Sequence, residues 1–212
     1  MENAWIFIVA FLLYWPSAFA LTLALFRQQV KSYLLNITIS SLIMANITYI
    51  IQSGQIPLGI AVVQPVLTLL CFWLIFRMKF SHALIVFVSY YVFNFIAEVI
   101  FYIFLSRIID SPFIILARDS VFLPFLFLTI VNIITAAVIR KYRLGFSFVS
   151  FHTKSRSNVS HLLPITIACL LSACTATASL FLSHDTVIPF MVFVFVAIGF
   201  ISYQFYRKEM SE

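Results

Sequence analysis

A single acidic side chain, Glu98, lies inside an otherwise apolar run. It belongs to the stretch NFIAEVIFYIF, residues 94–104, whose other side chains are mostly large aliphatic and aromatic groups. Every fourth residue here is polar, so a helix would align Tyr90, Asn94, Glu98, Tyr102 and Ser106 as one slowly drifting stripe. In such a helix Asn94 is one turn from Glu98, and its amide can hydrogen-bond the carboxylate directly.

The state of the Glu98 carboxylate depends on its neighbours in space. At the centre of a membrane helix a charged side chain costs roughly 2.5–3.5 kcal/mol on insertion scales, so it normally faces the interior of a bundle. Three states are open: an ion pair with an arginine, a protonated acid, or a site kept for a cationic ligand or a proton. Arg107 and Arg118 are the candidate counter-charges. Glu98 is therefore either a structural residue that fixes helix register or part of a ligand site.

Polar side chains in other apolar runs are candidates for the same site. Asn46, Gln64 and Asn132 each lie within a separate hydrophobic stretch, where they are able to face Glu98 across a helical bundle. The alternative for each is an interhelical hydrogen bond that holds two helices together. The complete set of ligand-binding candidates is Glu98, Asn94, Tyr90, Tyr102, Arg107, Arg118, Gln64, Asn46 and Asn132.

The element that must position these side chains is a membrane-embedded bundle. Hydrophobic residues make up 63% of the 212 and charged residues 9%, with a mean hydropathy of +1.10. A water-soluble domain of that composition is close to excluded. The apolar runs reach the roughly 20 residues that a helix needs to cross a bilayer, and they lack the alternation of barrel strands. The predicted fold is an all-α, polytopic helical bundle, with aromatic residues such as Trp15 at the membrane interfaces.

Uninterrupted apolar stretches predict about seven transmembrane helices in a single domain, residues 1–212. The seven spans are approximately 4–26, 32–51, 57–76, 82–105, 120–139, 161–182 and 186–206. The sixth span contains ACLLSACTATAS, whose small side chains let a neighbouring helix approach closely. We expect this span in tight helix packing or in a homodimer.

The positions of Lys and Arg set the expected orientation. Eleven of the thirteen lie between spans one and two, three and four, and five and six, or after span seven. Only Arg107 and Arg118 lie in the opposite connections. Because basic residues concentrate on the cytoplasmic side, we expect a cell-membrane protein with its N-terminus outside and its C-terminus inside.

The connection after the fifth span is long and basic. Its sequence, RKYRLGFSFVSFHTKSRSNVS, interleaves three phenylalanines with polar residues and five positive charges. This pattern suits a segment that rests on an anionic inner leaflet, although an ordinary cytoplasmic loop has the same composition.

The motifs of common enzymes are not present. The sequence contains no HExxH, GxSxG or phosphate-binding loop, and its closest His–Cys pair, His161 and Cys169, is about 12 Å apart along one helix. We therefore expect neither an enzyme nor a metal site nor a cofactor. The net charge of +6 comes from clusters that flank apolar runs, so nucleic acid is not an expected partner.

Two segments carry a resemblance to a known family: FWLIFRMKFSHALIVFVSYYVFNFIAEVIFYIFLSRII, and a last helix running into FISYQFYRKEMSE. With these Phe- and Ile-rich spans, the chain resembles the membrane sensor region of accessory-gene-regulator type peptide-pheromone receptor kinases of Gram-positive bacteria. The resemblance implies a quorum-sensing receptor in the bacterial cytoplasmic membrane, with a small secreted peptide bound near Glu98 and the outer connection. In that family the last helix continues into a kinase, whereas this sequence ends at Glu212, so signal transduction would need a partner protein.

Two other functions remain open. The size and all-helical character are similar to those of the substrate-binding membrane subunit of a small-solute transporter, such as the vitamin-capturing components of energy-coupling-factor transporters, which need a partner ATPase. Against this function, those subunits usually have six helices. A structural or assembly protein without a ligand is the third possibility, and it predicts that Glu98→Gln has no functional effect.

Overall fold

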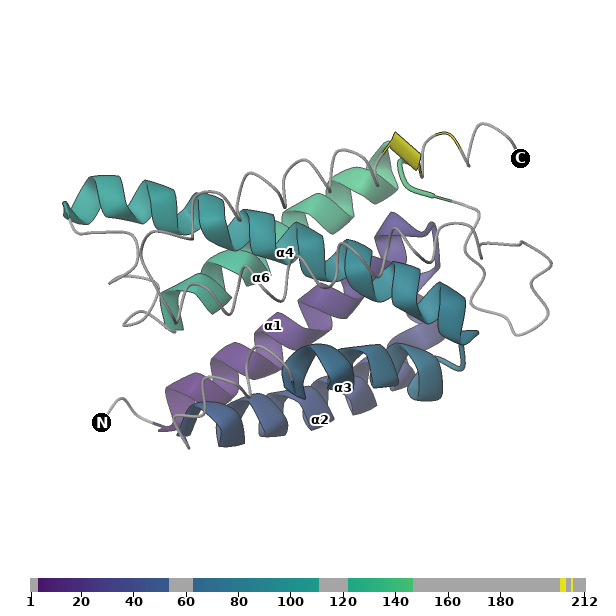
Figure 1. The fold of residues 1–212 in the computed structure, drawn as a ribbon, viewed down its shortest axis with the longest axis horizontal. Coiled ribbons are helices and arrows are strands. Elements are labelled where there is room, and N and C mark those ends of the chain that lie inside the picture. Colours follow the sequence, from purple (N-terminus) through teal and green to yellow (C-terminus); the bar gives the residue numbers. More distant parts are fainter. Residues whose placement is uncertain (1–3, 54–62, 111–121, 147–202, 205–206, 208–212) are drawn as a thin grey trace.

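The computed structural model describes residues 4–53, 63–110, 122–146, 203, 204 and 207 (Figure 1). The fold in these ranges is helical, and no strand occurs there. Apolar chains of this kind form helices in lipid because a helix pairs its backbone N–H and C=O groups within one segment. The all-α prediction is therefore confirmed for the described part of the chain.

Four long helices and three shorter pieces make up most of this part. Each is given with its bounds: α1, Ala4–Leu25; the 3₁₀ turn η1, Val30–Tyr33; α2, Leu34–Ser53; α3, Gln64–Leu70; the π-helical segment η3, Cys71–Ile75; α4, Phe80–Ile109; and α6, Phe122–Lys141.

The first helix lies at the centre of the described bundle. α1 makes its most extensive contacts with α6 and α2, and it also contacts α4 (Figure 1). Its buried aromatic rings form edge-to-face pairs with two neighbours: Phe11 with Phe125 of α6 at 4.9 Å, and Phe19 with Phe72 of η3 at 5.4 Å between ring centroids. Such pairs add roughly 0.5–1.5 kcal/mol each beyond the area that they bury. The core is thus built around α1.

The helix lengths agree with membrane spans. Within the described ranges, α1, α2 together with η1, α4 and α6 are each long and apolar enough to cross a bilayer. α4 has 30 residues and begins and ends outside the predicted 82–105, so at 1.5 Å per residue it measures about 45 Å. The predicted third span appears as a shorter apolar helix, Gln64–Ile75. Span 161–182 lies outside the described residues, as does nearly all of span 186–206.

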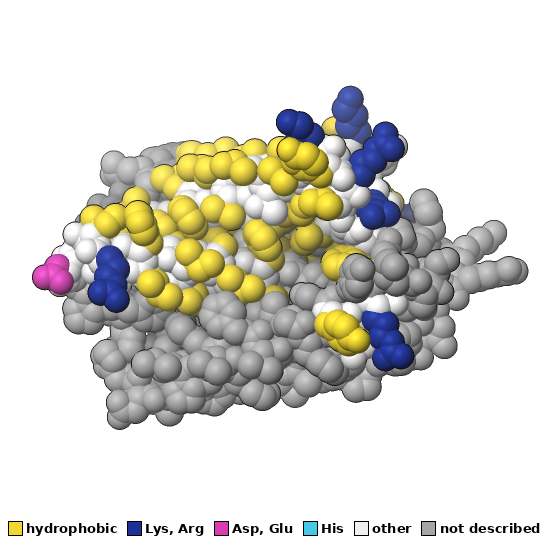
Figure 2. Space-filling view, turned by 90° about the horizontal axis from the view of Figure 1, so that it is seen from above, with side chains coloured by type: hydrophobic (Ala, Val, Ile, Leu, Met, Phe, Trp, Pro, Cys, Tyr) yellow, Lys and Arg dark blue, Asp and Glu magenta, His cyan; other side chains and the backbone are white. Residues whose placement is uncertain are grey.

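The helix directions gather positive charge at one end of the bundle. α1 and α6 end on the side where α2 and α4 begin (Figure 1). Figure 2 shows the Lys and Arg side chains collected mainly at one end of a largely apolar surface. We call this side the basic end; its described cations are Arg27, Lys31, Arg77, Lys79, Arg140, Lys141 and Arg143. Arg107 and Asp110 lie at the far end of α4.

At the basic end, arginine occupies the helix-terminating positions with positive φ, where glycine is usual. Beyond α1, the N–H of Arg27 donates to the Ala24 carbonyl at 3.1 Å, and the N–H of Gln28 donates to the Leu23 carbonyl at 2.8 Å. This pair of bonds is a Schellman motif, in which the residue with positive φ is usually glycine. Here it is Arg27, with φ 53°. The same left-handed conformation recurs after two other helices, in Arg77 and Arg143.

Candidate functional site

A buried polar cluster joins α1 and α4 in the apolar interior. The hydroxyl oxygens of Tyr14 on α1 and Tyr90 on α4 are 3.0 Å apart. The Tyr14 hydroxyl also donates to Oδ1 of Asn94 at 3.4 Å. All three side chains are at most 6% exposed. Two of the five residues of the predicted stripe, Tyr90 and Asn94, therefore contribute directly to this cluster.

Asn132 extends the cluster to α6. Its Nδ2 donates to Oδ1 of Asn94 at 3.1 Å, and the side chain is fully buried. Of the two roles expected for Asn132, facing Glu98 or forming an interhelical hydrogen bond, the structure shows an interhelical bond, to Asn94. We refer to Tyr14, Tyr90, Asn94 and Asn132 together as the tyrosine–asparagine cluster.

The hydrogen-bond directions in this cluster follow from its geometry. Asn94 Oδ1 accepts from Asn132, and Asn94 Nδ2 donates to the Tyr90 backbone carbonyl at 3.0 Å, which fixes the orientation of the Asn94 amide. With Tyr14 donating to Asn94, the Tyr90 hydroxyl is left to donate to Tyr14. Among the described residues, Oδ1 of Asn132 then has no donor, although the atom is buried. The cluster therefore ends in an unsatisfied acceptor.

Glu98 lies one helical turn beyond Asn94. Its side chain is partly buried, and its carboxyl group lies within electrostatic range of the hydroxyls of Tyr14, Tyr90 and Tyr102. No hydrogen bond or ion pair joins it to another described residue. The predicted direct bond from Asn94 to Glu98 is not formed; Asn94 Nδ2 donates instead to the Tyr90 backbone carbonyl, and Asn94 Oδ1 accepts from Tyr14 and Asn132. The carboxylate is thus a second acceptor next to the cluster.

The predicted counter-charges do not reach Glu98 in the described structure. Arg107 is exposed and lies nine residues further along α4, about 13 Å along the axis. Arg118 lies outside the described residues. Tyr102, the next member of the stripe, is buried on α4 within electrostatic reach of Glu98.

A second polar group lies on the other side of the α1 core. The indole N–H of Trp15 donates to Oγ1 of Thr48 at 3.2 Å, and the Gln64 amide donates to the same oxygen at 3.3 Å. Trp15 also packs against Tyr14 and Tyr90, with ring centroids 5.2 and 6.5 Å away. Gln64 therefore approaches the tyrosine–asparagine cluster only through Trp15.

The predicted place of Trp15 at a membrane interface is wrong. Its side chain is only 1% exposed and lies in the core of the bundle. The reason is that α2 offers the Thr48 hydroxyl at the same depth, so the indole N–H has a partner there and needs no interfacial water.

Asn46 does not join either polar group. Its side chain is exposed on α2 and donates to the Leu42 carbonyl of its own helix at 2.7 Å. This is the common local bond by which a short polar side chain satisfies itself on a helix.

The residue that sequence reasoning missed is Tyr14. It lies ten residues into α1, about 15 Å from the helix start and far from the ends where interfacial tyrosines occur. A tyrosine at that depth requires a partner for its hydroxyl, which is the signal that could have placed it in the cluster.

No protein-family model, curated protein or solved structure matches this chain. The chemistry of the site therefore follows from its own residues.

The arrangement suits binding of a hydrogen-bond donor. Asn132 Oδ1 is a buried acceptor without a donor among the described residues, and the partly buried Glu98 carboxyl group lies one helical turn from Asn94. Acceptors left unpaired in a low-dielectric interior are costly, so a group that supplies N–H or O–H donors gains more there than in water. No set of His, Cys, Asp or Glu suitable for a metal ion occurs in the described ranges. The site is thus a candidate for a ligand that supplies such donors.

Proposed function

We propose that this chain is the sensor-like domain of a membrane receptor for a small extracellular ligand, and that it signals through a partner protein. The observation that carries the proposal is the unsatisfied buried acceptor Asn132 Oδ1 in a hydrogen-bonded cluster that joins three helices, with the partly buried Glu98 carboxyl group one helical turn from Asn94. A small peptide is a suitable ligand class, because it carries backbone N–H donors and a positively charged amine.

The depth of Glu98 supports access from the outer side. At 1.5 Å per residue, Glu98 lies about 27 Å along the axis from Phe80 at the basic end and about 16 Å from Ile109. The basic end is the cytoplasmic one by the positive-inside rule. In that orientation, with seven spans and the N-terminus outside, Glu98 belongs to the outer half of the bundle.

The cellular setting proposed is the bacterial cytoplasmic membrane. The described helices match a multi-pass membrane protein in length and hydropathy. The same acceptors would equally serve a transporter subunit that captures a small solute, so the partner protein distinguishes the two functions.

The experiment is to purify the tagged chain in mild detergent from membranes of the organism that encodes it and to identify co-purifying proteins by mass spectrometry. A sensor kinase or a peptide-processing protein among them supports the receptor. An ATPase together with a coupling subunit would contradict the receptor and assign Glu98 to a transported substrate. Recovery of the chain without any partner would also contradict it.

A further inference from the structure

A second site lies at the basic end, where the ends of α1 and α6 meet the start of α2. It is a pocket of about 790 Å³ between the α1–α2 connection and the last turn of α6. The residues that line it are Ala24, Arg27, Gln28, Gln29, Val30, Lys31, Ile139, Arg140, Arg143 and Leu144. None of them belongs to the tyrosine–asparagine cluster.

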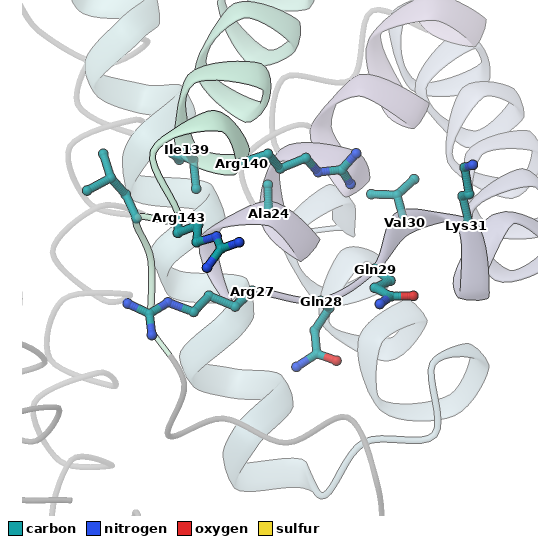
Figure 3. A pocket seen from close by; sticks show the side chains of 10 residues that line it. Ala24, Arg27, Gln28, Gln29, Val30, Lys31, Ile139, Arg140 and Arg143 are labelled. Atoms are coloured by element: carbon teal, nitrogen blue, oxygen red, sulfur yellow. The ribbon is translucent and has the colours of Figure 1, made fainter.

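The cations enter this pocket from two separate segments. Figure 3 shows Arg140 extending from α6 toward Val30, on the side of Lys31, while Arg143 projects from the turn that follows α6. Arg27, from the turn after α1, also lines the pocket. Lys31 and Arg140 are 109 residues apart in the sequence, so only the tertiary fold brings the charges of the two segments together.

The charge of the pocket strongly favours an anion. Its described lining contains four cations and no acidic residue. Two helix C-termini, those of α1 and α6, point at this end, and each carries the equivalent of about half a negative charge. The charges of Lys31, Arg140 and Arg143 by themselves outweigh that opposing contribution of about one charge. Arginine, moreover, presents a planar fork of N–H donors that matches the oxygens of a phosphate group.

Backbone contacts hold the two sides of the pocket together. The N–H of Phe146 donates to the Leu25 carbonyl at 2.7 Å, which fastens the turn after α6 to the end of α1. The turn itself repeats the Schellman motif of α1: Leu144 N–H donates to the Ile139 carbonyl at 2.9 Å, with Arg143 in the left-handed conformation at φ 52°. The position of Arg143 is thus set by the backbone.

The pocket also has an apolar side that continues onto the outer surface of the bundle. Ala24, Val30, Ile139 and Leu144 contribute to its lining. Exposed apolar side chains continue along the same helices, among them Leu34, Leu35 and Val138. A ligand that carries both a negative headgroup and hydrocarbon chains would fill this surface. A soluble anion would contact only the charged part of this surface.

We propose that this pocket binds the phosphate headgroup of an anionic phospholipid, whose acyl chains lie along the exposed faces of α2 and α6. Basic pockets between transmembrane helices at a membrane surface bind lipid headgroups in this way. The site is independent of the receptor function, since it lies at the opposite end of the bundle from the region proposed for the extracellular ligand.

The test is a titration of the full-length protein in mild detergent with phosphatidylglycerol, read by native mass spectrometry. Phosphatidylcholine with the same acyl chains serves as the zwitterionic comparison. The wild type should bind phosphatidylglycerol more tightly. The double variant Arg140→Gln with Arg143→Gly should bind phosphatidylglycerol about thirty-fold more weakly. The two removed cations are expected to contribute about equally to the binding of an anionic lipid.

A matched control separates this pocket from the general positive charge of the basic end. Arg77→Gly with Lys141→Gln removes the same number of charges at the same end, and it also replaces one left-handed arginine by glycine. Neither residue lines the pocket. This control should bind phosphatidylglycerol as the wild type does. The second test variant, Lys31→Gln with Arg140→Gln, changes no residue with positive φ. It should weaken binding of phosphatidylglycerol as much as the first double variant does.

Two outcomes would overturn the proposal. An equal loss in the pocket variant and the control variant would mean that lipid is held by diffuse charge. If inorganic phosphate at equal concentration displaced phosphatidylglycerol from the wild type, the pocket would be a site for a soluble phosphate compound. Preferential loss in both pocket variants, without displacement by phosphate, is the result expected.

Discussion

Asn132 of α6 donates its side-chain N–H to the side-chain oxygen of Asn94 on α4, across 3.1 Å in the buried interior. The bond links two helices that are separated in sequence by residues 110–121. Because Asn94 also accepts from Tyr14 and donates within α4, one amide ties α1, α4 and α6 together. This relationship is the structural basis of the candidate site.

A double-mutant cycle measures that link. Asn94→Ala and Asn132→Ala should each destabilise the bundle, with the larger loss at Asn94 because its removal leaves the Asn132 donor and the Tyr14 hydroxyl without their acceptor. The coupling free energy should be roughly 0.6 kcal/mol, the average for interhelical hydrogen bonds in membranes. Unfolding by denaturing detergent in mixed micelles provides the measurement. Asn46→Ala, whose amide bonds only within α2, is the control and should change stability by less than about 0.5 kcal/mol.

The Trp15–Thr48 bond predicts a second stability effect. Thr48→Val keeps the shape of the side chain but removes the acceptor of the buried indole N–H and of the Gln64 amide. Leaving a buried donor unpaired costs about 1–3 kcal/mol. Thr38→Val on the same helix is the matched control, because Thr38 is exposed and bonds only to the Leu34 carbonyl. Equal losses of unfolding free energy in the two variants would show that the indole bond is not formed.

Two turns at the basic end, one after α6 and one after η3, predict opposite effects at positions with positive φ. Gly145 has φ 111°, and an added Cβ would lie 2.5 Å from the Leu25 carbonyl oxygen, so Gly145→Ala should destabilise by about 1–3 kcal/mol. Arg77→Gly should instead stabilise by roughly 1 kcal/mol, since glycine adopts the left-handed region without steric cost. Thermal unfolding in detergent measures both. A stable Gly145→Ala protein would contradict the packing of this turn against α1.

Much of the fold could be predicted from hydropathy, because length and apolar content decide whether a helix forms in lipid. The first predicted span, 4–26, nearly coincides with Ala4–Leu25. The fourth was predicted too short because Ser106 and Arg107 interrupt its apolar pattern, although α4 continues to Ile109 and stops at Asp110, whose φ is 54°. Polar residues beyond the hydrocarbon layer do not end a helix, so hydropathy underestimates its length.

The site was only partly predictable. Four-residue spacing placed Tyr90 and Asn94 on one face, since this spacing depends on helix geometry alone. The choice of partners depended on the rotation of neighbouring helices, which local sequence does not determine. For this reason Asn132 was found among several equivalent candidates, Asn46 turned out to bond to its own helix, and Tyr14 was missed.

The orientation predicted from basic residues is testable with single cysteines. Ile109→Cys, exposed at the far end of α4, should react with a membrane-impermeant maleimide in intact cells. Tyr142→Cys, exposed at the basic end, should react only after the membrane is permeabilised. Labelling of the wild type measures the background from its own cysteines, Cys71, Cys169 and Cys174, and is subtracted. The reverse labelling pattern would mean that the basic end faces outward, against the positive-inside rule.

The most direct test of the receptor proposal is the thermal unfolding midpoint of the purified protein with the low-molecular-mass peptide fraction of culture medium from the organism that encodes it. Wild type and Asn46→Ala should both be stabilised relative to fresh medium, because a ligand that binds the folded state raises the midpoint. Glu98→Gln should keep its expression but lose most of the shift, since removing one partner of a buried charged pair costs about 2–5 kcal/mol of binding. An undiminished shift in Glu98→Gln, or no shift in the wild type, would contradict the role assigned to this carboxylate.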